Sequence, residues 1–233
     1  MTDPVWKMIY LARRNPQLRA EDFPQAWREH STLGRQCKNV ATRVKSVAQC
    51  SLVLEPAGLA GTDQTYDGVN LLVLSDRESA AAIWSDPETL AVMRPDEPRV
   101  FSTYVRHFSL VCREHVLRDQ PRSAVVLYGF LRRRAGLAAD DFYLAWSAAN
   151  PARALVQGPL GCAGRVVVNE VVDTPPPGYE FDVIVEWWFA CVDEVAQAFG
   201  SRAVHDQLPD ALTRLLEVNG SVFLLTQVTH SRP

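Results

Sequence analysis

The segment DFPQAWREH, residues 22–30, combines two large aromatic side chains with one titratable ring. If the segment is helical, Phe23, Trp27 and His30 stand at i, i+4 and i+7 and share one face. Histidine suits proton transfer near neutral pH, so His30 is our first candidate for a catalytic acid or base. The alternatives are structural: the aromatics are typical of a core, and a histidine at a helix C-terminus can interact with the helix dipole.

A second group of polar residues lies in FDVIVEWWF, residues 181–189. In a strand, Asp182, Glu186 and Trp188 share a face, because side chains alternate. A carboxyl group in an apolar cavity has a raised pKa and can exchange protons near neutral pH, so Glu186 is predicted to be a catalytic partner of His30. Asp182 and Trp188 are predicted substrate contacts. Asp67 holds the position equivalent to Asp182 and is the other possible catalytic partner, unless both aspartates cap a turn or pair with an arginine.

Three further side chains are predicted to contact substrate. Trp27 accompanies His30 on the helix, and Tyr10 lies on the first expected strand. His107 belongs to an expected strand over residues 104–112, on the face that includes Val105 and Ser109. Core packing for Trp27 and Tyr10, and a solvated position for His107, are the alternatives.

Several classes of protein are disfavoured by the absence of their motifs. The sequence contains no G-x-G-x-x-G, Walker, G-x-S-x-G or H-E-x-x-H pattern. The five histidines never stand at i, i+4, so we predict neither a metal site nor a cofactor. The five cysteines form no close pair and are expected to be reduced.

Composition narrows the set of partners. The 233 residues include 47% hydrophobic residues, with 24 basic against 27 acidic residues. Without a long basic block we expect no nucleic acid partner. Without a stretch of about 20 apolar residues or a signal-like N-terminus we expect a cytoplasmic protein with no membrane contact.

The aromatic helix segment occurs twice. Residues 13–27 and 132–146 are identical at eight of fifteen positions, and residues 66–84 have a weaker counterpart at 181–199. We therefore predict two repeats, 1–117 and 122–233, joined by a charged connector that includes Pro121. The second copy keeps Phe142 and Trp146 but has Ala149 where the first has His30, so the predicted packing role is duplicated and the polar role is not.

Each repeat must build the elements that position these residues. In the first repeat we expect strands at residues 5–14, 43–54, 68–74 and 104–112 and helices at 21–31 and after Ser75, whose spacing to Glu78 is that of a capping box. The order βαββαβ is the ferredoxin-like arrangement, which is α+β. Its sheet has one face without helices, and two such faces can bury each other.

These residues resemble the EthD-type family of dimeric α/β-barrel proteins. The resemblance rests on an early strand ending in arginine, then Leu, two acidic residues, Phe and Trp-Arg-Glu-His, and later Tyr-Asp-Gly before a strand. It covers nearly the whole chain, once per repeat, and implies two fused ferredoxin-like repeats packed as one pseudo-symmetric barrel. A further homodimer is possible, and in some barrels of this architecture one histidine binds haem.

The resemblance implies a cofactor-free enzyme of small-molecule metabolism, of the lyase, cyclase or isomerase type. Its substrate would be aromatic, polyketide-like or otherwise apolar and would bind in a barrel pocket near His30, with Glu186 and Trp188 as walls. One alternative is a cofactor-independent monooxygenase. The other is a non-catalytic protein that carries a hydrophobic ligand.

Overall fold

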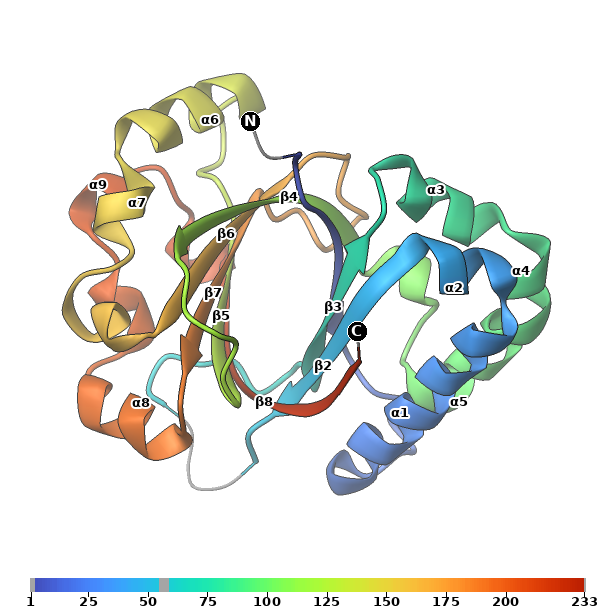
Figure 1. Ribbon diagram of the computed structural model, residues 1–233. Coiled ribbons are helices and arrows are strands. Elements are labelled where there is room, and N and C mark those ends of the chain that lie inside the picture. Colours follow the sequence, from blue (N-terminus) through green and yellow to red (C-terminus); the bar gives the residue numbers. More distant parts are fainter. Residues whose placement is uncertain (1–2, 55–58, 233) are drawn as a thin grey trace.

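The strands close into a single barrel. The computed structural model describes residues 3–54 and 59–232, and its eight strands follow the order β1-β3-β2-β8-β5-β7-β6-β4 around the barrel (Figure 1). Every neighbouring pair is antiparallel. The strands are β1 (Trp6–Ala12), β2 (Val44–Leu52), β3 (Gly68–Leu74), β4 (Ser109–Arg118), β5 (Val125–Leu131), β6 (Arg165–Val171), β7 (Val183–Phe189) and β8 (Val222–Arg232).

Each half of the chain contributes one ferredoxin-like sheet. The first sheet runs β4-β1-β3-β2 and the second β8-β5-β7-β6, which is the same order shifted by four strands. The two sheets join through β2 with β8 and through β4 with β6. The predicted fold, a pseudo-symmetric barrel of two fused βαββαβ repeats, is therefore confirmed.

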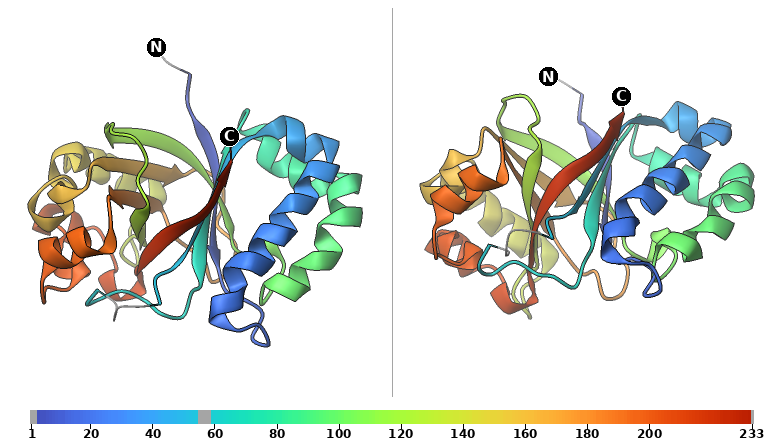
Figure 2. Two further views of the ribbon diagram at one scale, coloured as in Figure 1. Left: turned by 60° about the horizontal axis from the view of Figure 1, so that its bottom comes forward. Right: turned by 90° about the horizontal axis from the view of Figure 1, so that it is seen from below.

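Helices cover the barrel on two opposite sides (Figure 2). Those of the first half are α1 (Phe23–Leu33), α2 (Lys38–Arg43), α3 (Glu78–Ser85), α4 (Pro87–Val92) and α5 (Glu97–Val100). Those of the second half are α6 (Ala139–Ala148), α7 (Pro151–Ala154), α8 (Val192–Phe199) and α9 (Asp210–Thr213). In the described part of the chain, none of them has the length and apolar character that crossing a bilayer requires.

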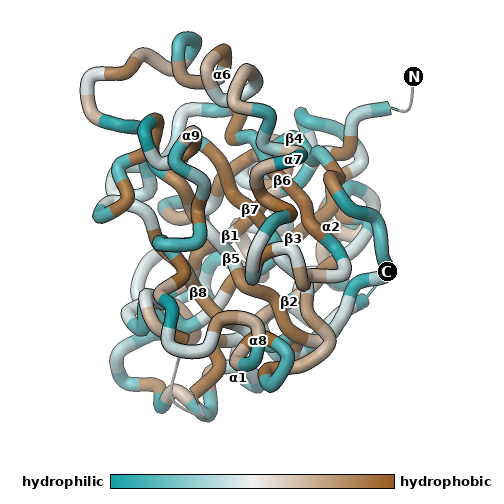
Figure 3. Tube along the Cα trace, turned by 90° about the vertical axis from the view of Figure 1, so that its left-hand side faces the viewer, coloured by the Kyte–Doolittle hydropathy of each residue, from teal (hydrophilic) through white to brown (hydrophobic). Residues whose placement is uncertain are grey.

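Strand alternation divides the apolar residues into three cores. Inward residues such as Leu71, Tyr128 and Ile184 fill the barrel, and outward residues pack under the helices of each half. Hydrophobic colour is accordingly concentrated on the strands, while the helices are mixed (Figure 3). Most of the barrel interior is thus a packed core.

The repeated aromatic pair has the same packing role in both halves. Phe23 and Trp27 on α1, and Phe142 and Trp146 on α6, are all buried against the outer face of their own sheet. The ring centroids lie 4.9 Å apart in the first pair and 5.8 Å in the second. The predicted core role of these aromatics is therefore observed in both copies.

Two local expectations were wrong. The strand expected at residues 104–112 begins only at Ser109, because residues Val105–His107 form a 3-10 turn, η4, closed by hydrogen bonds from the Val105 N–H to Glu97 (2.9 Å) and from Ser109 Oγ to the Val105 carbonyl (2.6 Å). The expected capping box at Ser75 is replaced by Asp76, which accepts the Ser79 N–H at 2.8 Å.

Candidate functional site

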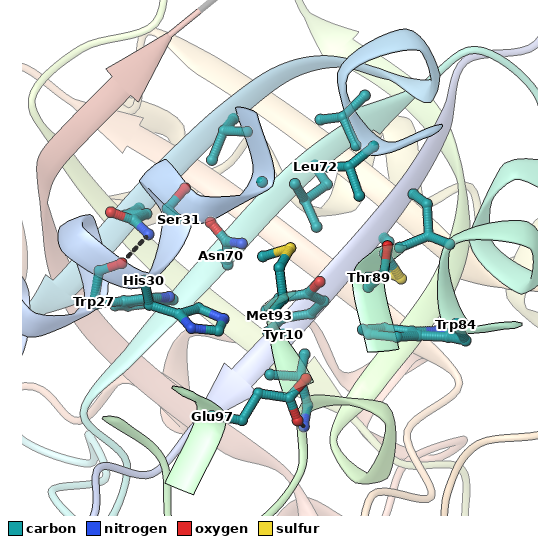
Figure 4. Close-up of a pocket in the computed structure, with 18 of the residues that line it drawn as sticks. Tyr10, Trp27, His30, Ser31, Asn70, Leu72, Trp84, Thr89, Met93 and Glu97 are labelled. Carbon is teal, nitrogen blue, oxygen red and sulfur yellow. Dashed lines mark hydrogen bonds between the residues drawn. The ribbon is translucent and has the colours of Figure 1, made fainter. Parts of the chain in front are cut away.

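A cavity lies between the first sheet and its helices, outside the barrel (Figure 4). Its floor is the outer face of β1, β2 and β3, and its walls come from α1, α3, α4 and the segment around α5. About 50 Å³ is open to the centre of a water-sized molecule, enough for a few waters. A larger guest must therefore displace lining side chains, of which the unbranched Met93 is the most adaptable (Figure 4).

His30 forms part of the wall of this cavity. The side chain is buried, and its ring packs edge-on against Phe101 at a centroid distance of 5.4 Å. His30 Nδ1 lies 3.0 Å from Asp96 Oδ2. Burial lowers the pKa of His30 below its ordinary 6.5, and the hydrogen bond to Asp96 only partly offsets this effect.

The carboxylate fixes the orientation of the imidazole. Asp96 belongs to the 3-10 segment η3 (Arg94–Asp96) and also accepts hydrogen bonds from Arg99 at 2.7 Å and 3.1 Å. These bonds to Arg99 are the main cause that lowers the pKa of Asp96, so the group stays ionised. An ionised carboxylate can only accept, so neutral His30 carries its proton on Nδ1 and keeps a free lone pair on Nε2. The ring points toward the side of the cavity where Tyr10 and Met93 lie (Figure 4).

Polar side chains cross the floor of the cavity in one row. The strand register pairs Tyr10 with Asn70 and Asn70 with Gln49. Gln49 donates to the Trp27 carbonyl at 3.3 Å, but Gln49 Oε1 and Asn70 Oδ1 are buried acceptors without a partner among the described atoms. Such groups are rare in folded proteins and favour a ligand that donates hydrogen bonds.

Two titratable groups of the cavity, Glu97 and Tyr10, have a raised pKa and so keep their proton to a higher pH than usual. Burial raises the pKa of Glu97, against the opposing effects of the Val105 N–H and Arg94. Burial, and then the charge of Glu97, raise the pKa of Tyr10 well above its ordinary value of 10.0. Tyr10 is consequently a neutral hydroxyl donor across the physiological pH range.

Glu186 lies elsewhere, inside the barrel. It accepts hydrogen bonds from Lys7 (2.6 Å), Asn169 (2.8 Å) and the Trp188 indole (2.9 Å), and Lys7 also lies 2.6 Å from Glu114. Burial alone would raise the pKa of Glu186, but the ammonium of Lys7 reverses the effect and the pKa is lowered. The expected contact with His30 is not formed, and the expected raised pKa was wrong, because the sequence does not show that Lys7 faces the same interior.

Asp67 and Asp182 form equivalent clamps at the ends of the strands. Asp67 accepts the Arg14 N–H and Asp182 the Arg133 N–H, each at 2.8 Å, and each aspartate also pairs with the guanidinium of the same arginine. Both aspartates therefore pair with an arginine, which was the structural alternative to a role in catalysis or substrate binding. Neither aspartate lines the cavity of His30.

The remaining predicted site residues are divided between three places. Trp27 and Tyr10 line the cavity with His30. Trp188 faces the barrel interior, and the Arg122 guanidinium lies 5.6 Å from its ring centre. His107 is exposed in η4 and contacts Thr103 at 3.2 Å, since strand alternation does not apply to a turn.

The mouth of the barrel offers a second, more open space of about 400 Å³ beside Trp188. Its lining includes Arg122, several serines and Arg232, which also borders the outer cavity, but neither a carboxylate nor a histidine among the described residues. It has no group suited to accept a proton near neutral pH. Proton-transfer chemistry is therefore better supported at the outer cavity.

Asp96, Gln49 and Asn70 were missed as candidates. Asp96 is 66 positions from His30, in a proline-rich turn whose course no local spacing reveals. Gln49 and Asn70 carry a weak signal, a single amide in the middle of an apolar strand, which a search for buried polar residues would find.

The outer cavity does not fit a metal ion or a haem. Residues 3–54 and 59–232 contain no cluster of three His, Cys, Asp or Glu side chains able to hold a metal. A histidine whose Nδ1 is bound to a carboxylate is a common axial ligand, so the dyad alone suits haem iron. The space beside it, about 50 Å³, must open for any aromatic guest, and a porphyrin needs several times more room than a molecule of three fused rings.

Comparison with known proteins supports the fold. The sequence matches no protein-family model and no curated protein. An anthrone oxidase-like protein of known structure is similar with a TM-score of 0.62 and 13% identity, over 99% of this chain and 93% of the other. A protein from Fusobacterium nucleatum, provisionally assigned as a monooxygenase, gives a TM-score of 0.52 at 7% identity, over 98% of this chain and 94% of the other. Likeness at such identities shows the dimeric α/β-barrel fold alone.

Proposed function

We propose that this chain is a cofactor-free enzyme of small-molecule metabolism that removes a proton from an apolar, aromatic substrate in the outer cavity of its first half. The observation that carries the proposal is the buried Asp96–His30 pair on the wall of that cavity. We also propose that the chain is of the EthD type, which rests on the WREH motif that contains His30.

The roles of the residues follow from their protonation states. His30 Nε2 takes the proton, and Asp96 stabilises the imidazolium that forms. The negative charge left on a substrate oxygen is stabilised by hydrogen bonds from the Tyr10 hydroxyl and the Asn70 amide on the floor. Surrounding side chains such as Trp27, Leu72 and Trp84 exclude water, which strengthens each of these interactions.

Removal of the proton leaves a carbanion whose charge is shared with the substrate oxygen. The next reaction of this carbanion distinguishes two types of enzyme. Its rearrangement or elimination makes the enzyme a lyase, cyclase or isomerase. Its reaction with dioxygen makes it a monooxygenase, and the structural likeness to an anthrone oxidase-like protein favours this second type. For a ring methylene, the balanced reaction is CH2 plus O2 giving C=O plus H2O, so no further reductant is needed.

Anthrone is a suitable first substrate because it contains an acidic ring methylene. Turnover with one O2 consumed per anthraquinone formed, and its loss in His30→Gln, supports the monooxygenase. Turnover of anthrone-like substrates without O2 uptake supports the other reaction types. Binding without turnover of any C–H acid in a panel of such aromatics would overturn the proposal in favour of a ligand carrier.

A further inference from the structure

Three arginines lie around the edge of the outer cavity. Arg28 and Arg35 are exposed residues outside the lining itself, and they lie about one helical turn before and after Ser31, which belongs to it. Arg232, near the end of β8, lines the same cavity and pairs with Val47 in the sheet. Arg232 comes from the second half, so β8 brings this charge to a site otherwise built from the first half.

These arginines have no acidic partner in the described part of the chain. None of its ion pairs includes Arg28, Arg35 or Arg232, and the acids of this region, Glu29 and Asp96, are held by Arg99. Most other arginines near the cavity are paired, as Arg94 is with Glu97 at 3.4 Å. The excess charge at the edge is therefore not compensated locally.

The positive charges of these residues lower the pKa of their neighbours. Burial and then Arg35 lower the pKa of Arg232. Burial, followed by the charges of Arg28, Arg232 and Arg35, lowers the pKa of His230, whose strand partner is Gln49 on the cavity floor. Like charges held together beside a partly dehydrated space raise the free energy of the empty site, and a bound anion lowers it.

The rest of the cavity defines the other end of such a ligand. Its walls are mainly apolar, and its floor presents the free acceptors Gln49 Oε1 and Asn70 Oδ1. Guanidinium groups match the planar oxygens of a carboxylate, sulfonate or phosphate. One ligand can thus satisfy both regions if its aromatic body carries a hydrogen-bond donor for the floor and an anionic group at one end.

We infer that the outer cavity takes an amphipathic anion, with the aromatic body toward His30 and the anionic group on Arg28, Arg35 and Arg232. This assignment rests on the proposed function and deepens it: the aromatic part of the substrate stays apolar, and its far end carries an anionic group. It predicts that turnover and binding depend on the charge of the substrate and not only on its ring system.

The test uses two fluorescent probes of almost the same shape. 8-Anilino-1-naphthalenesulfonate carries one negative charge, and N-phenyl-1-naphthylamine lacks it. We expect Arg232→Gln and Arg35→Gln each to weaken binding of the sulfonate about tenfold and to leave the neutral probe unchanged. Raising the salt concentration should also weaken only the sulfonate. Arg153→Gln, which removes an exposed arginine on α7, is the matched control and should change neither affinity.

The outcomes separate the inference from the proposed site. Equal effects of the arginine variants on both probes, or no effect on either, would overturn the anion assignment. Ser31→Trp should fill the edge of the cavity and abolish binding of both probes. If both probes bind Ser31→Trp as tightly as the wild type, the cavity itself is not the binding site and the proposed function fails with it. Circular dichroism and the melting temperature of each variant confirm that it is folded.

Discussion

His30 owes its proposed reactivity to two opposing influences. Burial removes water from the ring and lowers its pKa, while Asp96 holds Nδ1 and supports the charged form that catalysis would create. The equivalent position in the second half is Ala149, which packs against an apolar core. The first half therefore carries a polar side chain at a position where the second half has only a small apolar one.

Replacing His30 by Gln should lower kcat/KM by about 10²-fold or more, because a general base contributes roughly that factor. The fold should be retained, since Gln is of similar size and the second half tolerates Ala at the equivalent position. The effect is measured by steady-state kinetics with anthrone, or with whichever aromatic C–H acid of the panel is turned over. His205→Gln, which removes a half-buried histidine outside the cavity lining, is the control, and equal activities of the two variants would remove His30 from the mechanism.

Asp96→Asn should also lower turnover, by about 10²-fold, for a different reason. An amide can donate to Nδ1, which moves the imidazole proton to Nε2 and occupies the lone pair that faces the cavity. Probe binding should stay within about twofold of the wild type, so the loss appears in kcat and not in KM. A variant with unchanged kcat would show that the hydrogen bond does not set the tautomer.

The depressed pKa of His30 has a consequence for pH. The base is active when neutral, so kcat/KM should fall as the pH drops through a value below 6.5. Stability changes in the same direction. The histidine of the unfolded chain binds a proton near pH 6.5, and that of the folded chain binds one only at lower pH. The free energy of unfolding therefore decreases as the pH falls from 6.5 to the pKa of the folded state. His30→Gln should show a weaker loss of stability over this interval in urea titrations, and an identical loss would contradict the assignment.

At the scale of elements, the position of α1 depends on a close approach to β3. A Cβ added to Gly68 would lie 2.6 Å from the Cys50 carbonyl oxygen and 2.7 Å from a ring carbon of Trp27. Gly68→Ala should therefore destabilise the protein by about 1–3 kcal/mol and displace the helix that carries His30. Gly164→Ala is the control, because its nearest neighbour would lie at 3.8 Å. Equal melting temperatures of the two variants would show that α1 does not depend on this contact.

The elements themselves were largely predictable from sequence, and the contacts of the site were not. β3 follows the expected residues 68–74, because alternation and β-branching are local signals. The match between residues 13–27 and 132–146 also made it possible to predict two copies of one fold. The contacts of His30 with Asp96 and of Glu186 with Lys7 join residues 66 and 179 positions apart, and the course of the intervening turns decides them. The cavity was expected inside the barrel, but large side chains such as Tyr128 and Trp188 fill most of that space.

At the scale of the whole molecule, the barrel is closed around a buried ionic network. Lys7 and Glu186 are fully buried and bind each other across the interface of the two halves, with Glu114 as a second partner of Lys7. Lys7→Met leaves the carboxylates without their cation and should cost about 3–5 kcal/mol in the free energy of unfolding. Adding Glu186→Gln should recover part of the loss, and Lys45→Met, an exposed change on β2, should cost little. A Lys7→Met protein as stable as the wild type would show that the network contributes nothing to barrel closure.

Fusion of the two halves explains why one chain would carry a single site. The equivalent region of the second half is filled by Trp187 and its neighbours in the core, whereas the first half has Leu72 in place of Trp187 and leaves a cavity beside His30. The second half supplies Arg232 to that cavity, in place of the predicted Glu186 and Trp188. A covalently joined pair of repeats permits this difference, because the two copies no longer share one sequence.

The most direct test of this account is a nitrogen-15 NMR spectrum of the histidine side chains, recorded against pH and then with N-phenyl-1-naphthylamine. The chain contains five histidines, and the signals that disappear in His30→Gln identify those of His30. The account predicts a neutral His30 with its proton on Nδ1, a pKa below 6.5, and a shift of the free Nε2 when the probe binds, while His107, His115 and His205 stay unchanged. A proton on Nε2, a pKa above 6.5, or a probe that shifts the other histidines and leaves His30 unaltered would contradict it.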